Sequence, residues 1–126
     1  MKIKFYLTIV IVLLLVLSAC TNGSPGNPSA KDILKSNKDA DILQYNGLIY
    51  ENVENYDYLT DLNHVVKIDE IGEVKETKES YRGFNDFSAS KLPVGSKVFS
   101  TSEEFNYFLI IELNEEDIIY TVILEG

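Results

Sequence analysis

Apolar residues follow two different patterns along this chain. A run without charged residues extends from Phe5 to Leu17, directly after a short start that contains two lysines. A basic start followed by such a run is typical of an export signal. The run has thirteen residues, whereas a helix that spans a membrane needs about 20. From residue 40 onward, short apolar runs alternate with polar turns, which indicates a β-rich domain.

The segment 42–51 has the pattern of a β-hairpin, because its two apolar halves are separated by Asn46-Gly47. Asn-Gly supplies the two residues of positive φ that a type I′ turn requires, and this turn matches the twist of paired strands. The face formed by Leu43, Tyr45, Leu48 and Tyr50 is wholly apolar or aromatic, so it is expected to point into the core. A two-residue loop would pair these residues as Tyr45 with Leu48 and Leu43 with Tyr50.

The spacing of apolar residues changes in the segment 53–62. Asn52 precedes it in the position of an N-cap, and Asn63 follows it as a stop signal. The pattern predicts one short helix. Its apolar side chains recur at every third position: Val53, Tyr56, Leu59 and Leu62.

Further strands are predicted at 65–77, 97–101, 105–113 and 118–124. Val66 and Ile68 alternate with polar residues in the first of them, and Gly72 interrupts it in the manner of a β-bulge. Leu92-Pro93-Val94-Gly95 fits a type I turn that leads into the second. The last two strands are almost continuously apolar and are joined by the acidic link 114–117, so they are expected at the centre of the sheet.

Together these elements predict one small antiparallel β domain over residues 40–126. It would contain roughly five to seven strands and one short helix, as a barrel or a strongly twisted sheet. The segment before it, residues 20–39, is rich in Pro, Gly, Ser and Asn, and this composition predicts a flexible tether. Ile33 and Leu34 are the only large apolar residues of the tether and could form one helical turn.

The residues Leu17-Ser18-Ala19-Cys20 end the export signal. They resemble the lipobox of bacterial lipoproteins, which has an aliphatic residue, two small residues and a cysteine. The resemblance implies that residues 1–19 are removed and that a lipid is attached to the sulfur of Cys20. The mature protein would then be a lipoprotein anchored on the outer face of the cytoplasmic membrane.

A second resemblance covers most of residues 40–126 and rests on turn motifs. These are Gln44–Tyr50, Leu92–Lys97 and the closing Glu125-Gly126. They resemble small, uncharacterised exported domains of Gram-positive bacteria. Because the shared motifs are turns, the resemblance concerns the fold and implies no known activity.

Net charge restricts the partners of the domain. The chain has 11 basic and 20 acidic residues, and removal of Lys2 and Lys4 would leave 9 against 20, a net charge of −11. Nucleic acid is therefore a poor partner, since its binding depends on neutralising phosphates with Lys and Arg. Anionic headgroups should repel the domain as well, so that it stands off the membrane on its lipid. A cationic peptide or a divalent ion fits the charge better, although acidity also simply keeps an exported domain soluble.

Few residues are of the types that support catalysis or metal binding. Cys20 is the only cysteine and His64 the only histidine, whereas a zinc site needs three or four such ligands. We therefore expect no metal or cofactor site. The acidic link 114–117 could hold calcium weakly, but a solvated turn is the favoured interpretation. Paired carboxylates leave a small carboxylate-based hydrolase as an alternative, because a glycosidase needs two of them at a defined separation.

The segment 80–91 shows no strand or helix period and carries Tyr81, Arg82, Phe84 and Phe87. Aromatic residues and arginine on a loop are typical of binding hot spots, so these four residues are the candidate binding site. The alternative is that the aromatic side chains pack inward and form a compact loop. The sequence thus predicts a non-catalytic binding lipoprotein of unknown ligand, or a sequestering or immunity-type protein for a cationic peptide.

Overall fold

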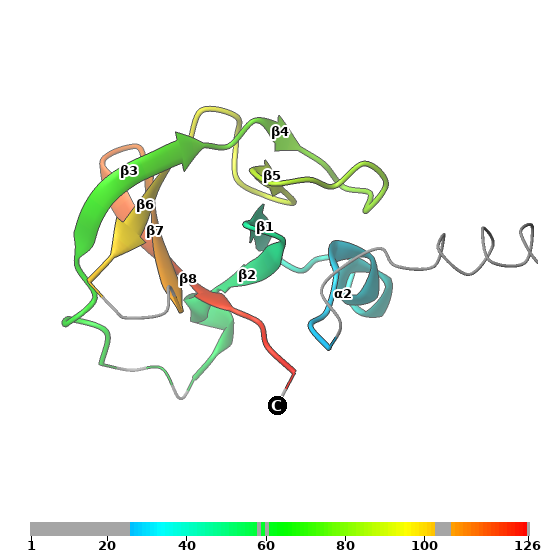
Figure 1. Cartoon of the computed structure of the whole chain (residues 1–126), viewed down its shortest axis with the longest axis horizontal. Helices are drawn as coiled ribbons and strands as arrows, with labels where there is room; N and C mark the ends of the chain where they lie inside the picture. The colour runs from blue at the N-terminus through cyan, green and yellow to red at the C-terminus, as the bar shows by residue number, and fades with distance from the viewer. Residues whose placement is uncertain (1–25, 58, 60, 103–106, 126) are drawn as a thin grey trace, which may run out of the picture.

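The computed structural model of the protein describes residues 26–57, 59, 61–102 and 107–125. Within these residues, one short α-helix, α2 (Ala30–Ser36), accompanies a single sheet that curls strongly into a half-barrel (Figure 1). Its eight strands are β1 (Ile42–Tyr45), β2 (Leu48–Asn52), β3 (Lys67–Glu73), β4 (Glu76–Thr77), β5 (Ser88–Ala89), β6 (Lys97–Thr101), β7 (Phe108–Leu113) and β8 (Glu116–Val122). Their order across the sheet is β3-β6-β7-β8-β2-β1-β5-β4.

The mainly β architecture was predicted correctly, but two details of the sheet differ. Its eight strands exceed the expected number, because β4 and β5 have two residues each, too few to show a period. These two strands pair in parallel, so the sheet is mixed rather than antiparallel. The other neighbouring strands pair antiparallel, and β7 and β8 lie in its interior, as predicted.

The hairpin of β1 and β2 has the predicted register, with Leu43 opposite Tyr50 and Tyr45 opposite Leu48. Asn46 and Gly47 have φ values of 52° and 74°, which confirms two consecutive residues of positive φ in the turn. The last hairpin uses a similar turn at Asn114-Glu115, with φ values of 52° and 65°. The acidic connection is therefore two residues long, and β8 begins earlier than the sequence indicated.

The sheet buries apolar side chains on both faces. Side chains of β1 and β2 alternate between two clusters, so this hairpin contributes to each of them. The inner cluster fills the half-barrel with Leu43, Tyr50, Val74, Ala89, Leu92, Val98, Leu109, Ile111 and Tyr120. The outer cluster lies under α2 and contains Ala30, Leu34, Ala40, Ile42 and Ile49, with Ile33, Tyr81, Phe84 and Ile123 packed against it.

Helix α2 lies in the segment that we expected to be a flexible tether, and for residues 30–36 that prediction was wrong. Ser29 and Asp32 form a capping box: the backbone N–H of Asp32 donates to Ser29 Oγ, and the N–H of Ser29 donates to the Asp32 carboxylate. Leu34 is only 5% exposed and packs on the outer face of the hairpin. A helix of seven residues is marginal on its own, so this docking stabilises it.

The described residues of the stretch 53–62 do not form the predicted helix. A single 3-10 turn, η2 (Val53–Asn55), takes its place, and no regular element follows among the described residues up to Val66. Apolar side chains at every third position match the three residues per turn of a 3-10 helix better than the 3.6 of an α-helix. Asn52 does act as the N-cap, since its side chain accepts a hydrogen bond from the N–H of Glu54 at 3.0 Å.

The strand predicted over 65–77 is divided into β3 and β4. Its register against β6 shifts between Lys67 and Glu70 and again between Glu70 and Gly72, which confirms an irregularity at this glycine. The shifts change which side chains face inward. Val66 and Ile68, whose alternation indicated the strand, are therefore 53% and 57% exposed, whereas Val74 is fully buried.

Replacement of Gly47 by valine tests the turn between β1 and β2. A Cβ atom at this position would meet no other atom within 4 Å, so any loss of stability must come from the positive φ. A β-branched residue is a steric outlier there, and we expect the free energy of unfolding to fall by at least about 1 kcal/mol in a denaturant titration. Gly47→Asn is the matched control and should cost less, since asparagine tolerates this region. Equal stability of the parent and Gly47→Val would contradict the turn.

Candidate functional site

The four predicted binding residues lie in different surroundings in the structure. Tyr81 and Phe84 pack against the outer cluster beside α2, whereas Phe87 packs against the inner cluster. Arg82 is exposed, and its backbone N–H donates to Ser80 Oγ at 3.2 Å. The four side chains therefore do not form one continuous surface, and Arg82 is the only exposed residue of the four.

Phe87 is held by contacts within the domain. Its ring centroid lies 5.7 Å from that of Tyr45, and the ammonium group of Lys75 lies 5.3 Å from its centroid. Its backbone N–H donates to the carbonyl of Gln44 at 2.7 Å, with Phe87 at a φ of 67°. A Cβ atom at Gly72 would come within 2.5 Å of the ring. These contacts account for the position of Phe87 without a ligand.

A groove of about 560 Å³ separates α2 from the loop that follows β4. Of the predicted site residues, Tyr81 alone lines it. Ser90 is buried at its base, where its hydroxyl donates to the carbonyl of Ala40 at 2.6 Å and accepts from the N–H of Ile42 at 2.8 Å. The complete lining is Leu34, Lys35, Lys38, Asp39, Glu79, Ser80, Tyr81, Ser90 and Lys91.

Basic side chains of α2 lie over one wall of this groove. The ammonium groups of Lys31 and Lys35 are each 5.8 Å from the centroid of the Tyr81 ring, within the range of cation–π contacts. Asp32 is engaged in the cap of the helix, where hydrogen bonds from Ser29 hold the pKa of its carboxyl below the usual value. The groove thus presents more positive charge than the composition of the chain suggests.

A polar network that the sequence did not reveal joins Asp41, the residue before β1, to β2 and β8. The hydroxyl of Tyr120 donates to one carboxylate oxygen of Asp41 at 2.8 Å, and the amide of Asn52 donates to the other at 3.0 Å. Burial, followed by the charge of Asp41, raises the pKa of Tyr120, and burial raises the pKa of Tyr50 to about 12. Both phenols therefore stay protonated at neutral pH, and Asp41 serves as a structural acceptor for Tyr120 and Asn52.

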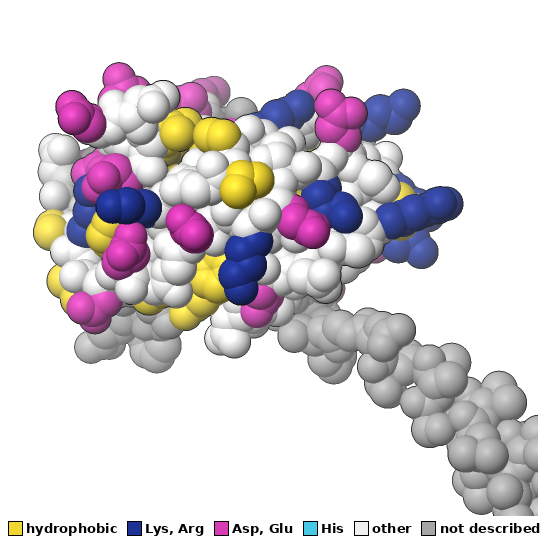
Figure 2. Space-filling view, turned by 90° about the horizontal axis from the view of Figure 1, so that it is seen from above, with side chains coloured by type: hydrophobic (Ala, Val, Ile, Leu, Met, Phe, Trp, Pro, Cys, Tyr) yellow, Lys and Arg dark blue, Asp and Glu magenta, His cyan; other side chains and the backbone are white. Residues whose placement is uncertain are grey.

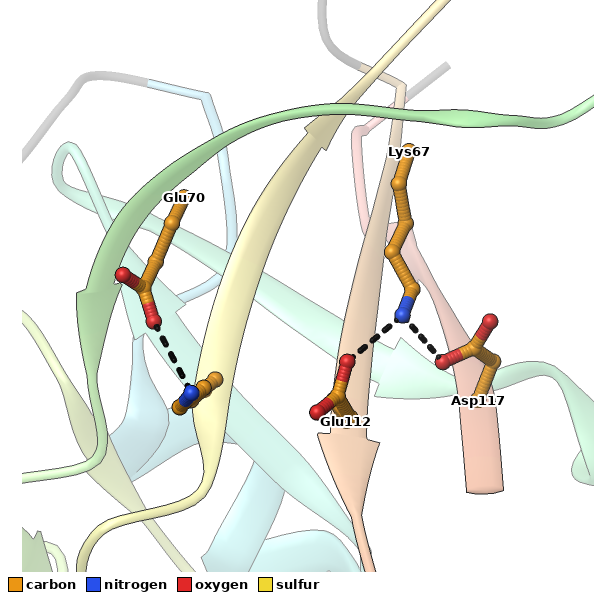
Figure 3. Close-up of polar contacts among 5 residues, drawn as sticks. Lys67, Glu70, Glu112 and Asp117 are labelled. Carbon is orange, nitrogen blue, oxygen red and sulfur yellow. Dashed lines mark hydrogen bonds and ion pairs between the residues drawn. The ribbon is translucent and has the colours of Figure 1, made fainter. Parts of the chain in front are cut away.

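The carboxylates near the last hairpin turn are partly paired. Lys67 reaches from β3 to Glu112 and Asp117, with both distances 2.7 Å, while Lys97 lies 4.0 Å from Glu70 (Figure 3). The hydrogen bonds to Asp117 and Glu112 raise the pKa of the Lys67 ammonium. Among the described residues, no three or more His, Cys, Asp and Glu side chains are grouped so as to hold a metal ion.

His64 is exposed, and its backbone carbonyl accepts a hydrogen bond from the hydroxyl of Ser102 at 3.1 Å. The segment predicted to be an export signal and Cys20 lie outside the described residues. Within the part of the chain that is described, no helix has the length and apolar character needed to cross a membrane. Comparison with protein-family models, curated proteins and solved structures found no match.

The contact between Gly72 and Phe87 can be tested with a double-mutant cycle. Gly72→Ala places a methyl group against a ring that is itself packed on Tyr45, so we expect a loss of about 1–3 kcal/mol in the free energy of unfolding. In a Phe87→Ala background the obstacle is gone, and the same substitution should cost much less. Equal costs in both backgrounds would show that the ring does not lie on Gly72.

Proposed function

We propose that this chain is an exported lipoprotein that is anchored through Cys20 and acts by binding rather than by catalysis. The observation that supports the anchor is the sequence Leu17-Ser18-Ala19-Cys20, directly after an apolar run with a basic start. The location implied by this sequence is the outer face of the cytoplasmic membrane. A lipid at Cys20 would hold the β-rich domain on that face.

The contacts of the carboxylates favour binding over a hydrolase. Asp41 is bonded to Tyr120 and Asn52, and Asp117 is bonded to Lys67, as is typical of groups that stabilise a fold. A hydrolase would need a pair of carboxylates in a cleft, one of them kept protonated as a general acid. The groove beside α2 has Asp39 and Glu79 in its lining, and both residues are exposed rather than held in the apolar surroundings that keep such an acid protonated.

The partner that we favour is a cationic peptide, and the structural feature that suggests it is strand β3. This strand ends the sheet, and on its outer side no described strand pairs with it. It carries the exposed carboxylates of Asp69, Glu70 and Glu73. Ile68 and the preceding Val66 add exposed apolar surface beside them.

An extended peptide can add to such an edge as a further strand, with backbone hydrogen bonds giving affinity and side chains giving specificity. Lysine or arginine side chains would meet the carboxylates, and apolar side chains would cover Val66 and Ile68. The competing interpretation is that the same charges and bulges protect an edge strand against association with another sheet. The two interpretations differ in whether a cationic peptide binds here.

The anchor is tested by Cys20→Ser. The substitution removes the sulfur that would carry the lipid, so the protein should lose its partitioning into the detergent phase or remain with its signal attached. The measurement is detergent-phase extraction of cells together with the mass of the protein. Unchanged partitioning and mass would contradict a lipid at Cys20.

The edge is tested by titrating the protein with an alternating lysine–valine decapeptide and measuring affinity by calorimetry. Glu70→Gln combined with Glu73→Gln should weaken binding by at least about tenfold, a loss of about 1.4 kcal/mol. The matched control, Asp39→Asn with Glu79→Gln, removes the same charge beside α2 and should change affinity little. Equal weakening by both pairs would mean that binding follows net charge, and absence of binding would contradict the peptide proposal while leaving the anchor intact.

A further inference from the structure

Charge is divided unevenly between two regions of the domain. The segments 30–40 and 78–91 contain six of the nine basic residues that the structure describes, but only four of its eighteen acidic ones. They lie together, because they form the two walls of the groove and meet in the outer cluster. The remaining described residues hold three basic and fourteen acidic side chains. We call the six basic residues of segments 30–40 and 78–91 the basic face. They are Lys31, Lys35, Lys38, Lys78, Arg82 and Lys91.

The basic face lies where the described chain begins. Figure 1 shows α2 at one end of the molecule, beside the point at which the chain enters the domain, while β3 lies toward the other end. In Figure 2 the dark-blue side chains gather at the same end, and magenta ones are frequent at the opposite end. Five of the six basic residues are exposed, and Lys78 is half-buried next to Glu76.

We propose that the basic face docks on the anionic phospholipid surface to which the protein is anchored, so that α2 and the groove face the membrane. This inference rests on the proposed lipid at Cys20. Only five residues lie between Cys20 and Gly26, where the described chain begins, and the six steps along the chain from one to the other span at most about 21 Å. The anchor thus keeps α2 close to the headgroups, whatever path the intervening residues take.

Screening allows the local charge to outweigh the net charge. At physiological ionic strength the Debye length is about 8 Å, so carboxylates at the far edge of the sheet contribute little at a surface beside α2. Each lysine or arginine near an anionic leaflet strengthens binding by roughly fivefold. With six basic and four acidic residues, the two segments carry a net charge of +2. Of the four carboxylates, Asp39 and Glu79 line the groove, and Asp32 is bonded to Ser29 in the helix cap. Asp86 accepts from Gln44 and the N–H of Gly47, on the hairpin side. The net charge of −11 therefore does not prevent this end of the domain from approaching a membrane.

The experiment uses the protein isolated from cells that express the whole chain, reconstituted in two kinds of vesicle, one of phosphatidylcholine and one containing phosphatidylglycerol. An amine-reactive reagent that does not cross membranes labels accessible lysines, and mass spectrometry gives the rate at each site. Lys35, Lys38 and Lys91 should react several-fold more slowly on the anionic vesicles, and 1 M salt should abolish the difference. Lys75 and Lys97, outside the basic face, should react equally on both.

A pair of charge-reversal variants distinguishes docking from a general effect of charge. Lys38→Glu with Lys91→Glu should remove the protection of Lys35, whereas Lys75→Glu with Lys97→Glu changes the net charge equally and should preserve it. Unchanged thermal unfolding would verify that both variants fold. A protein that floats with both vesicles but shows no lipid-dependent protection would contradict the docking alone. A protein that floats with neither would contradict the anchor at Cys20 and the docking with it.

Discussion

The fold depends on burying both faces of the hairpin formed by β1 and β2. Successive side chains of a strand point to opposite faces, so Leu43 and Tyr50 fill the half-barrel while Ile42 and Ile49 point away from it. Each such residue stabilises the domain by about 1.5–3 kcal/mol only if its face is covered. The inner face is covered by the curl of the sheet itself. The outer face is covered by α2 and the loop after β4. Packing on this face stabilises both segments, although neither has a strong pattern in the sequence.

The loop after β4 shows how distant contacts determine a segment without a local pattern. The N–H of Phe87 donates to Gln44 on β1, and the N–H of Lys75 donates to the carbonyl of Phe87. These bonds place the ring over Gly72, where the absence of a side chain on bulged β3 makes room for it. The same glycine therefore serves the register of the edge strand and the packing of the loop. Ser90 connects the end of the same loop to the start of β1, because its hydroxyl donates to the carbonyl of Ala40 and accepts from the N–H of Ile42.

Features set by adjacent residues could be predicted from the sequence, and features set by distant contacts could not. Asn46-Gly47 determines its own turn, and the turn determines the register of β1 and β2. Helix α2 instead depends on the surface under Leu34, and the two-residue strands β4 and β5 depend on pairing partners. For the candidate site, composition identified the unusual residues of the loop but not their directions. Tyr81 lies at the groove, Phe84 and Phe87 are packed, and Arg82 is exposed.

The charge of the domain follows the same rule. Its net value can be read from the sequence, whereas the distribution of charged side chains over the surface depends on the fold. The sequence yields a net charge of −11 for residues 20–126, the predicted mature part, and repulsion by an anionic membrane follows if this charge is treated as one quantity. Folding separates the basic side chains from many of the acidic ones. The segment with α2 and the loop after β4 bring their lysines together, while β3 carries carboxylates at the edge of the sheet. Charges further apart than a Debye length act almost independently, so the two regions can attract partners of opposite sign. If the basic face lies on the membrane, the acidic edge is left free toward the exterior, where a cationic peptide would arrive. Anchoring and binding would then use different surfaces of the domain and would not compete.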